Sequence, residues 1–254
     1  MNIFREIGFL FVRGLKQSIR PWPALLPSLF LPVFFLLVFG ASLQSVTKLP
    51  GFVGSSYIVF YAPVAILQAI FFSSGDAGTD LVVDITSGYL DKLLIAPIHR
   101  VAILVGKLLA VGLRAAVQAL VVIAIILLIG GKVVTGFPGL LVILALAAVF
   151  GMAWSGIGMT IALLTKNQRA TQSAFILFFP FTFITTSQLP LNLLSGWYKV
   201  AVQLNPVTAI LEALRALTST GWNGSVIAHG FLTAIIVGII TLTAATLSFR
   251  RVTA

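Results

Sequence analysis

The feature that most constrains this chain is a series of six long apolar runs. Each is close to the roughly 20 residues that an α-helix needs to cross the hydrocarbon core of a bilayer. The third run is longer than a bilayer requires, so we expect its beginning to project into water. The sequence therefore predicts an all-α, polytopic membrane protein with six transmembrane helices, at approximately residues 24–43, 57–75, 101–129, 140–164, 170–189 and 227–249.

Composition excludes several other classes of protein. Of the 254 residues, 59% are hydrophobic and only 9% are charged, whereas a soluble domain carries about 25% charged residues. The net charge of +10 comes from basic residues at the ends of apolar runs, which indicates contact with anionic lipids and no nucleic acid partner. Because the chain has no cysteine and only two histidines, we expect no disulfide and no metal site.

The distribution of lysine and arginine predicts the orientation. With the N-terminus inside, twelve of the sixteen basic residues fall in inner segments, and the outer ones hold only Lys48, Lys132, Lys199 and Arg215. Inner loops carry the excess of positive charge in membrane proteins. We therefore expect a multi-pass protein of a prokaryotic cell membrane (the inner or cytoplasmic membrane), with both termini in the cytoplasm and residues 1–254 forming a single transmembrane domain.

Residues 1–22 precede the first run and predict a helix at the membrane surface. One face of this segment is rich in Phe, Ile and Leu, and the other carries basic residues such as Arg5 and Lys16. This pattern is typical of a helix lying in the headgroup plane, and Pro21 ends it. A signal peptide is the alternative, but its charged part would be too long and the apolar run that follows is long enough to span.

The polar interval between the second and third runs predicts a short amphipathic helix at about residues 85–97. Ile85, Tyr89 and Leu93 recur every four residues and therefore share one helical face. Pro97 cannot continue the helix. On the inner side of the membrane, such a helix either docks into another protein or is an ordinary interfacial loop helix.

Two stripes of polar residues are expected at the inner ends of the second and third runs. The acidic stripe consists of Asp76, Asp80 and Asp84, spaced by four. The basic stripe consists of Lys107 and Arg114, with Gln118 one turn further in. An unpaired charge at the centre of a bilayer costs about 2.5–3.5 kcal/mol on insertion scales, so we expect the stripes to approach each other. They form either a polar vestibule or moving brace, or a static brace with snorkelling side chains.

Residues 190–225, between the last two runs, are too apolar for a solvated loop. Asn205 followed by Pro206 is typical of a helix N-cap and first helical residue. Glu212 and Arg215 stand three apart and can pair on one helical face. We expect two short helices that enter the outer leaflet and return, with Trp197 near the interface. A plain surface loop is the alternative.

Motifs for several other activities are absent. The sequence has no G-x-x-x-x-G-K-[ST], H-E-x-x-H or G-x-S-x-G string, so we assign no P-loop and no catalytic residue. A stripe of small residues including Gly151, Ser155 and Gly158 allows close helix packing or dimerisation. The fifth run is crowded with phenylalanines, which either face lipid and core or line a substrate path. The candidates for that path are Gln68, Phe175, Phe178 and Phe179.

The order of these elements resembles the membrane subunits of type 2 ABC exporters, in particular the drug-resistance type and its lipid and polysaccharide relatives. The strings SGYLDKLLIAPIHRVAILVGKLLA and LNPVTAILEALRAL are similar to the two recognisable segments of that family. The resemblance covers essentially the whole chain.

The resemblance implies a permease that is no enzyme by itself. Its partners would be an ATP-binding cassette subunit, a second copy of itself or a similar permease, and membrane lipids. ATP and magnesium would bind in the cassette subunit, and no cofactor is expected in this chain. The re-entrant pair would act as an outer gate. The short inner helix would be a coupling helix seated in the cassette, through Ser87, Tyr89, Leu90, Asp91, Leu93, Leu94, Pro97 and Arg100.

The expected function is ATP-driven export of amphipathic drugs or lipids along a path at the dimer interface. A permease for polysaccharides or lipid-linked glycans, from the same family, is the first alternative. A membrane-embedded lipid-modifying enzyme is another, but no histidine joins the acids at motif spacing. A channel would need rings of charge or a filter-like loop.

Overall fold

The computed structural model describes residues 2–19, 22–50, 52 and 56–253, and only the backbone of residues 18–19, 22–27, 174–175 and 252–253. The described residues form helices and loops without a strand. The elements are α1 (Ile3–Ile19), α2 (Trp22–Ser42), η1 (Gln44–Lys48), α3 (Tyr57–Thr86), α4 (Tyr89–Ile95), α5 (Arg100–Leu128), α6 (Gly136–Thr165), α7 (Gln168–Ser173), η2 (Ala174–Leu177), α8 (Phe178–Phe183), η3 (Leu191–Leu193), α9 (Gly196–Leu204), α10 (Pro206–Arg215), a π-helical turn η4 (Ala216–Thr220) and α11 (Gly224–Thr253).

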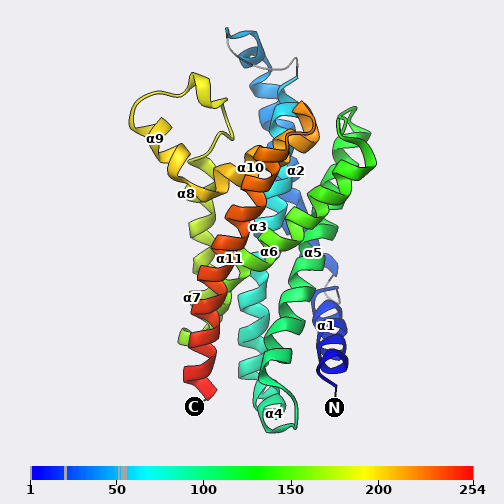
Figure 1. Cartoon of the computed structure of the whole chain (residues 1–254), viewed down its shortest axis with the longest axis vertical. Helices are drawn as coiled ribbons and strands as arrows, with labels where there is room; N and C mark the ends of the chain where they lie inside the picture. The colour runs from blue at the N-terminus through cyan, green and yellow to red at the C-terminus, as the bar shows by residue number, and fades with distance from the viewer. Residues whose placement is uncertain (1, 20–21, 51, 53–55, 254) are drawn as a thin grey trace.

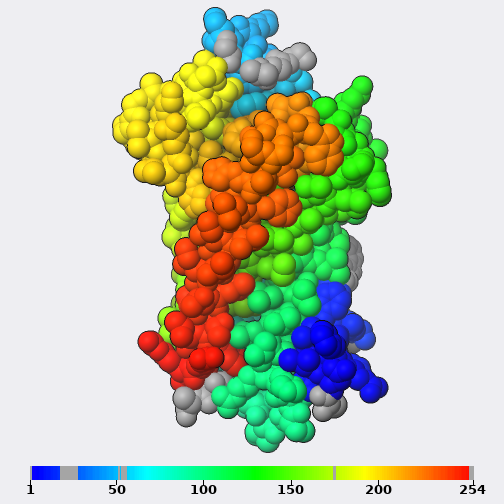
Figure 2. Space-filling view, viewed as in Figure 1, coloured from blue at the N-terminus to red at the C-terminus, as the bar shows by residue number. Residues whose placement is uncertain are grey.

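The long helices run along one axis, and the short elements gather at its two ends (Figure 1). At one end lie α1, α4 and the last turn of α11. At the other end lie η1, α9 and α10. In the space-filling view α1 lies beside α4 and α5 at the lower end (Figure 2). The predicted surface helix and the predicted short inner helix therefore share one end of the molecule.

Four helices of the described chain are long and apolar enough to cross a membrane: α3, α5, α6 and α11. The pair formed by α9 and the helix from Pro206 to Thr220 adds a fifth candidate if it is one span bent by 81°. The first predicted run forms α2, of which Ser28–Ser42 is the apolar helix with described side chains. The protein is therefore a multi-pass, all-helical membrane protein.

The fifth predicted run, residues 170–189, is not one continuous helix. It is divided into α7, η2 and α8, and the helix ends at Phe183. The pieces follow one another along the long axis (Figure 1). Pro180 lies inside α8 and has no N–H to donate to the preceding turn, which explains a weakened helix in this part. Pro180 predicted a kink in this run, and the structure divides the run into short helical pieces.

The central helix is α3, which is buried along most of its length between α2, α5 and α6. Its contact with α6 depends on small residues. A Cβ atom added to Gly78 would lie 2.5 Å from the backbone oxygen of Gly158. Of the two interpretations of the small-residue stripe, this contact supports close packing within the chain.

We expect Gly78→Ala to destabilise the protein by about 1–3 kcal/mol, because the added methyl group would clash with backbone and overpack the contact. Gly8→Ala in α1 is the matched control, since nothing lies within 4 Å of its added Cβ. Alanine is also favoured over glycine in helices by about 1 kcal/mol. Thermal unfolding in detergent measures both. Equal effects of the two substitutions would contradict the packing described.

Candidate functional site

The candidate site is a charged network at the end of the molecule where α1, α3, α4 and α5 meet. Helix α1 lies close enough to α5 that a Cβ on Gly106 would be 2.6 Å from the Cβ of Leu10. The polar face of α1 is thereby turned toward the end of α3. The sequence interpretation placed this face among lipid headgroups, because nothing in the segment itself identifies a protein partner.

The first contact of the network joins Glu6 of α1 to the start of α5. The Glu6 side chain is buried, and its Oε2 accepts a hydrogen bond of 3.0 Å from the backbone N–H of His99. The same oxygen lies 3.0 Å from Nδ1 of the His99 ring. The backbone hydrogen bond, with the ring contact, lowers the pKa of the Glu6 carboxyl. Sequence reasoning missed this pair, although Glu6 is the one acid in an otherwise basic segment.

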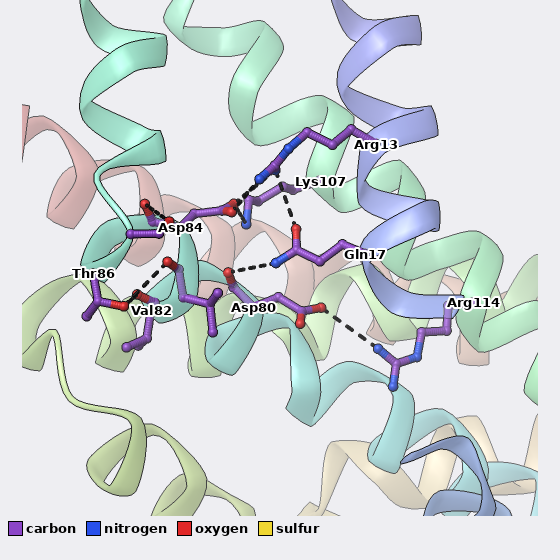
Figure 3. Close-up of polar contacts among 10 residues, drawn as sticks. Arg13, Gln17, Asp80, Val82, Asp84, Thr86, Lys107 and Arg114 are labelled. Carbon is purple, nitrogen blue, oxygen red and sulfur yellow. Dashed lines mark hydrogen bonds and ion pairs between the residues drawn. The ribbon is translucent and has the colours of Figure 1, made fainter. Parts of the chain in front are cut away.

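The second contact is a three-way ion pair at Asp84, which is 1% exposed. Nη2 of Arg13 lies 2.7 Å from Oδ1 of Asp84, and Nζ of Lys107 lies 2.5 Å from Oδ2 (Figure 3). The guanidinium carbon of Arg13 also lies 3.4 Å from the ring centroid of Tyr89 in α4. One buried carboxylate therefore ties α1 and α5 to the end of α3, and Arg13 extends the contact to α4.

The third contact is deeper, where Arg114 of α5 faces two acids of α3. Arg114 donates to Asp76 through Nη2. Its Nη1 lies 3.9 Å from Oδ2 of Asp80 (Figure 3). The structure thus brings the acidic and basic stripes together as expected. Gln118 does not join them, because its Nε2 donates to Oγ of Ser28 in α2 at 3.0 Å. Gln17 of α1, which sequence reasoning did not assign, donates to the backbone oxygen of Asp80 at 3.4 Å.

Helix α4 is held against the network by its own apolar residues. It begins after Gly88, whose φ of 68° is a backbone conformation that favours glycine. Leu90 is 2% exposed and packs with residues of α3 and α5, while Leu93 and Leu94 are half-buried against the same cluster. Tyr89 is half-buried beneath Arg13. Leu90, which was assigned to a docking surface, therefore lies inside the chain.

A different set of residues of this segment faces outward. Ile95 is 86% exposed, and it was not among the residues assigned from the sequence. Ile85, Tyr89 and Leu93 marked the inward face, so the sequence pattern identified the side that anchors α4. The other exposed residues between positions 85 and 100 are Thr86, Ser87, Asp91, Lys92, Pro97, His99 and Arg100.

At the opposite end, α9 and α10 form the predicted bent pair. Asn205 caps α10 by accepting from the Val207 N–H at 3.0 Å, with Pro206 at the start of the helix. Its Nδ2 also donates to the backbone oxygens of Phe181 and Ile184, at 2.9 and 2.6 Å. Asn205 thereby fixes the bend against the end of α8. Trp197 of α9 is 77% exposed, as expected for an interfacial residue.

Glu212 and Arg215 pair as their spacing predicts, at 2.5 Å, but Arg215 is buried. Its guanidinium donates to Oγ1 and O of Thr186, at 2.9 and 2.8 Å. It also lies 4.3 Å from the ring centroid of Phe60 in α3. This ion pair therefore connects the bent pair to α3 and to the segment after α8.

A cavity of about 370 Å³ lies between α2, α3, α6 and the α7–α8 segment. Phe178, one of the candidates for a substrate path, is among its lining residues. Phe179 is 43% exposed and is not among the lining residues. Gln68 is buried and donates to the Tyr61 hydroxyl at 3.2 Å. The side chain of Phe175 lies outside the part that the structure describes.

Comparison with known proteins gives a consistent set of matches. The sequence model of the ABC-2 type transporter family matches residues 5–218. The daunorubicin resistance ABC transporter permease protein DrrB1 of Streptomyces coeruleorubidus is 28% identical over 194 residues, covering 76% of this chain and 66% of the relative, just under two thirds.

Two further relatives are similarly distant. The probable doxorubicin resistance ABC transporter permease protein DrrC of Mycobacterium tuberculosis is 24% identical over 209 residues, covering 82% of this chain and 75% of the relative. The putative transport permease ycf38 of Cyanophora paradoxa is 24% identical over 214 residues, covering 83% and 73%.

The Glu6 contact is expected to depend on pH. A carboxyl whose pKa is lowered on folding stabilises the protein above its unfolded pKa of about 4.3, and this stability is lost as the pH falls through the folded pKa. Glu6→Gln should therefore lower the melting temperature near neutral pH, and its difference from the unsubstituted protein should shrink below about pH 4. Thermal unfolding of both proteins between neutral pH and pH values below about 4 measures this difference in melting temperature. A difference that does not change with pH would count against the contact.

The Arg114 pairs predict a specific pattern of coupling. In double-mutant cycles on unfolding free energy, Arg114→Ala should couple to Asp76→Asn by about 0.5–3 kcal/mol, as contacting pairs do, and less strongly to Asp80→Asn. Asp91→Asn, on the exposed side of α4, is the control and should be additive within about 0.5 kcal/mol. Additive losses for Arg114 and Asp76 would show that the pair contributes nothing to stability.

Proposed function

Because this chain belongs to the ABC-2 type transporter family and is a membrane permease subunit of an ABC exporter, we propose that it exports amphipathic compounds with energy supplied by a separate ATP-binding cassette subunit. Membership of the family implies partnership with such a subunit. ATP and magnesium would bind in the cassette, and this chain would supply the path through the membrane. The observation that carries the proposal is the position of α4.

Helix α4 suits the role of a coupling helix because it is exposed on one side and anchored on the other. Ile95 and Asp91 face away from the protein, while Leu90 is fixed in the core. The short helix also lies directly between α3 and α5 in the chain. A cassette that displaced α4 would therefore displace the ends of α3 and α5 together, through the ion pairs at Asp84.

We further propose six crossings, formed by α2, α3, α5, α6, the α7–α8 segment and α11. The end of the molecule with α1 and α4 would lie in the cytoplasm of a prokaryotic cell, together with both termini. The excess of basic residues in the segments at that end supports this orientation. Helices α9 and α10 would then lie in the outer leaflet as a gate, with the whole chain acting as one transmembrane domain.

A second copy of the chain, or a similar permease, would complete the path. Helix α2 supports this idea because Phe30, Phe34 and Leu37 on it are 64, 44 and 47% exposed, beside the cavity that α2 helps to line. The aromatic lining of that cavity favours compact amphipathic compounds over glycan chains. The names of DrrB1 and DrrC, which refer to daunorubicin and doxorubicin resistance, support the same class.

The coupling role predicts that Ile95→Asp prevents copurification with the cassette subunit, because a carboxylate would replace an apolar contact at the interface. Leu128→Asp is the matched control: Leu128 is also 86% exposed, at the opposite end of α5. Ile95 is a sharper test than Leu93 or Leu94, whose substitution would also disturb the core beneath α4. Membrane insertion should be normal in both variants. A complex that forms equally well with Ile95→Asp would exclude docking through α4.

A further inference from the structure

The cavity between α2, α3, α6 and the α7–α8 segment combines aromatic walls with a few polar groups. Phe71 is one of its lining residues, and its ring centroid lies 4.5 Å from that of Trp154 and 5.2 Å from that of Phe178, both edge-on. The lining also includes three residues with hydroxyl groups, Ser28, Ser74 and Thr79. Its volume of about 370 Å³ falls within the range of about 300–1,000 Å³ that is usual for small-molecule sites.

Asp76 is the one charged residue among the described residues that line this cavity. Its side chain is 47% exposed, although it lies within the most buried helix of the protein. The side chain of its partner Arg114 is only 11% exposed. The carboxylate is therefore accessible from the cavity, whereas Arg114 is not among the lining residues.

The partner of Asp76 has a second carboxylate within reach. Nη1 of Arg114 already lies 3.9 Å from Asp80, one helical turn along α3. Two acids therefore share one guanidinium at this level of the membrane, because Lys107 is paired with Asp84. If Asp76 turned to a ligand, Arg114 would keep a negative partner in Asp80, so the exchange would leave no unpaired charge in the membrane.

We propose that Asp76 recognises the positive charge of an organic monocation whose aromatic or apolar body occupies the cavity. The carboxylate would pair with the cationic group, and Phe71, Phe72 and Trp154 would contact the body and the charge through their ring faces. Asp76 is thus a specificity-determining residue for the exported compound. Export of the bound cation rests on the proposed function. Binding of the cation at Asp76 does not.

The test uses the full chain in detergent, without a cassette subunit, and equilibrium dialysis of labelled tetraphenylphosphonium. The anion tetraphenylborate, which has nearly the same shape, is the ligand control. The cation should bind and the anion should bind far more weakly. Asp76→Asn should weaken cation binding by about tenfold or more, as expected for loss of a charged hydrogen-bond or ion-pair partner.

Arg114→Gln provides a second variant with the opposite expected sign. Removing the competing guanidinium should tighten cation binding, whereas a merely structural role of the Asp76–Arg114 pair would make both variants bind worse. Asp80→Asn should weaken binding, since Arg114 would lose its alternative partner. Asp91→Asn, which removes the same charge outside the cavity, should leave binding of the cation unchanged.

Three outcomes would overturn the assignment: equal binding of cation and anion, unchanged cation affinity in Asp76→Asn, or weaker cation binding in both Asp76→Asn and Arg114→Gln. ATP-dependent transport by the complex with the cassette subunit tests the export function separately. Transport of a neutral or anionic compound that is insensitive to Asp76→Asn would contradict the role of Asp76 and leave export intact. If cation binding requires Asp76 but the complex transports nothing, the role of Asp76 stands and the export function is contradicted.

Discussion

Charges that are buried in or near a bilayer have to be paired, and the end of this protein that holds α1 and α4 is arranged around that requirement. Asp84 is almost completely buried and has two cationic partners, Arg13 and Lys107, from two different helices. Removing one partner of such a cluster leaves a charge without compensation in a medium of low polarity. The positions of α1, α3 and α5 relative to one another are therefore linked through this single carboxylate.

The pairing gives the short helix α4 mechanical significance. It follows α3 after only two residues and is anchored by Leu90 beneath and by Arg13 over Tyr89. A force applied to its exposed side would be carried by packed side chains and ion pairs into α3, which forms the wall of the cavity. At the other end, the buried Arg215 connects α10 to Phe60 of the same helix. Helix α3 thus joins the proposed coupling site, the cavity and the proposed outer gate.

Much of this architecture could be predicted from the sequence, because its signals are local. Apolar length identified α3, α5, α6 and α11, and the spacing of Asp76, Asp80 and Asp84 identified one helical face. Asn205 and Pro206 predicted the start of α10 correctly. The contacts of Glu6, Arg13 and Gln17 could not be predicted, since an amphipathic helix has the same pattern whether its polar face meets headgroups or another helix. The inward position of Leu90 could not be predicted for the same reason: an apolar helical face can anchor the helix to its own chain or dock it on a partner. The break in the fifth run reflects Pro180. It also reflects a tertiary contact, the hydrogen bonds that Asn205 donates to backbone oxygens at the end of α8.

In the proposed exporter, α3 and α4 move as one unit when the cassette binds ATP. Because the chain contains no cysteine, spin labels can be placed at the exposed positions Val83 and Lys92, and separately at Lys92 and Trp197. Distances measured by pulsed electron resonance in the assembled complex, with and without ATP, test the claim directly. If α3 and α4 move together, the distance between positions 83 and 92 stays unchanged and the distance between positions 92 and 197 changes. A changed distance between positions 83 and 92, with the distance between positions 92 and 197 constant, would show that α4 moves independently of α3 and would contradict the joint movement.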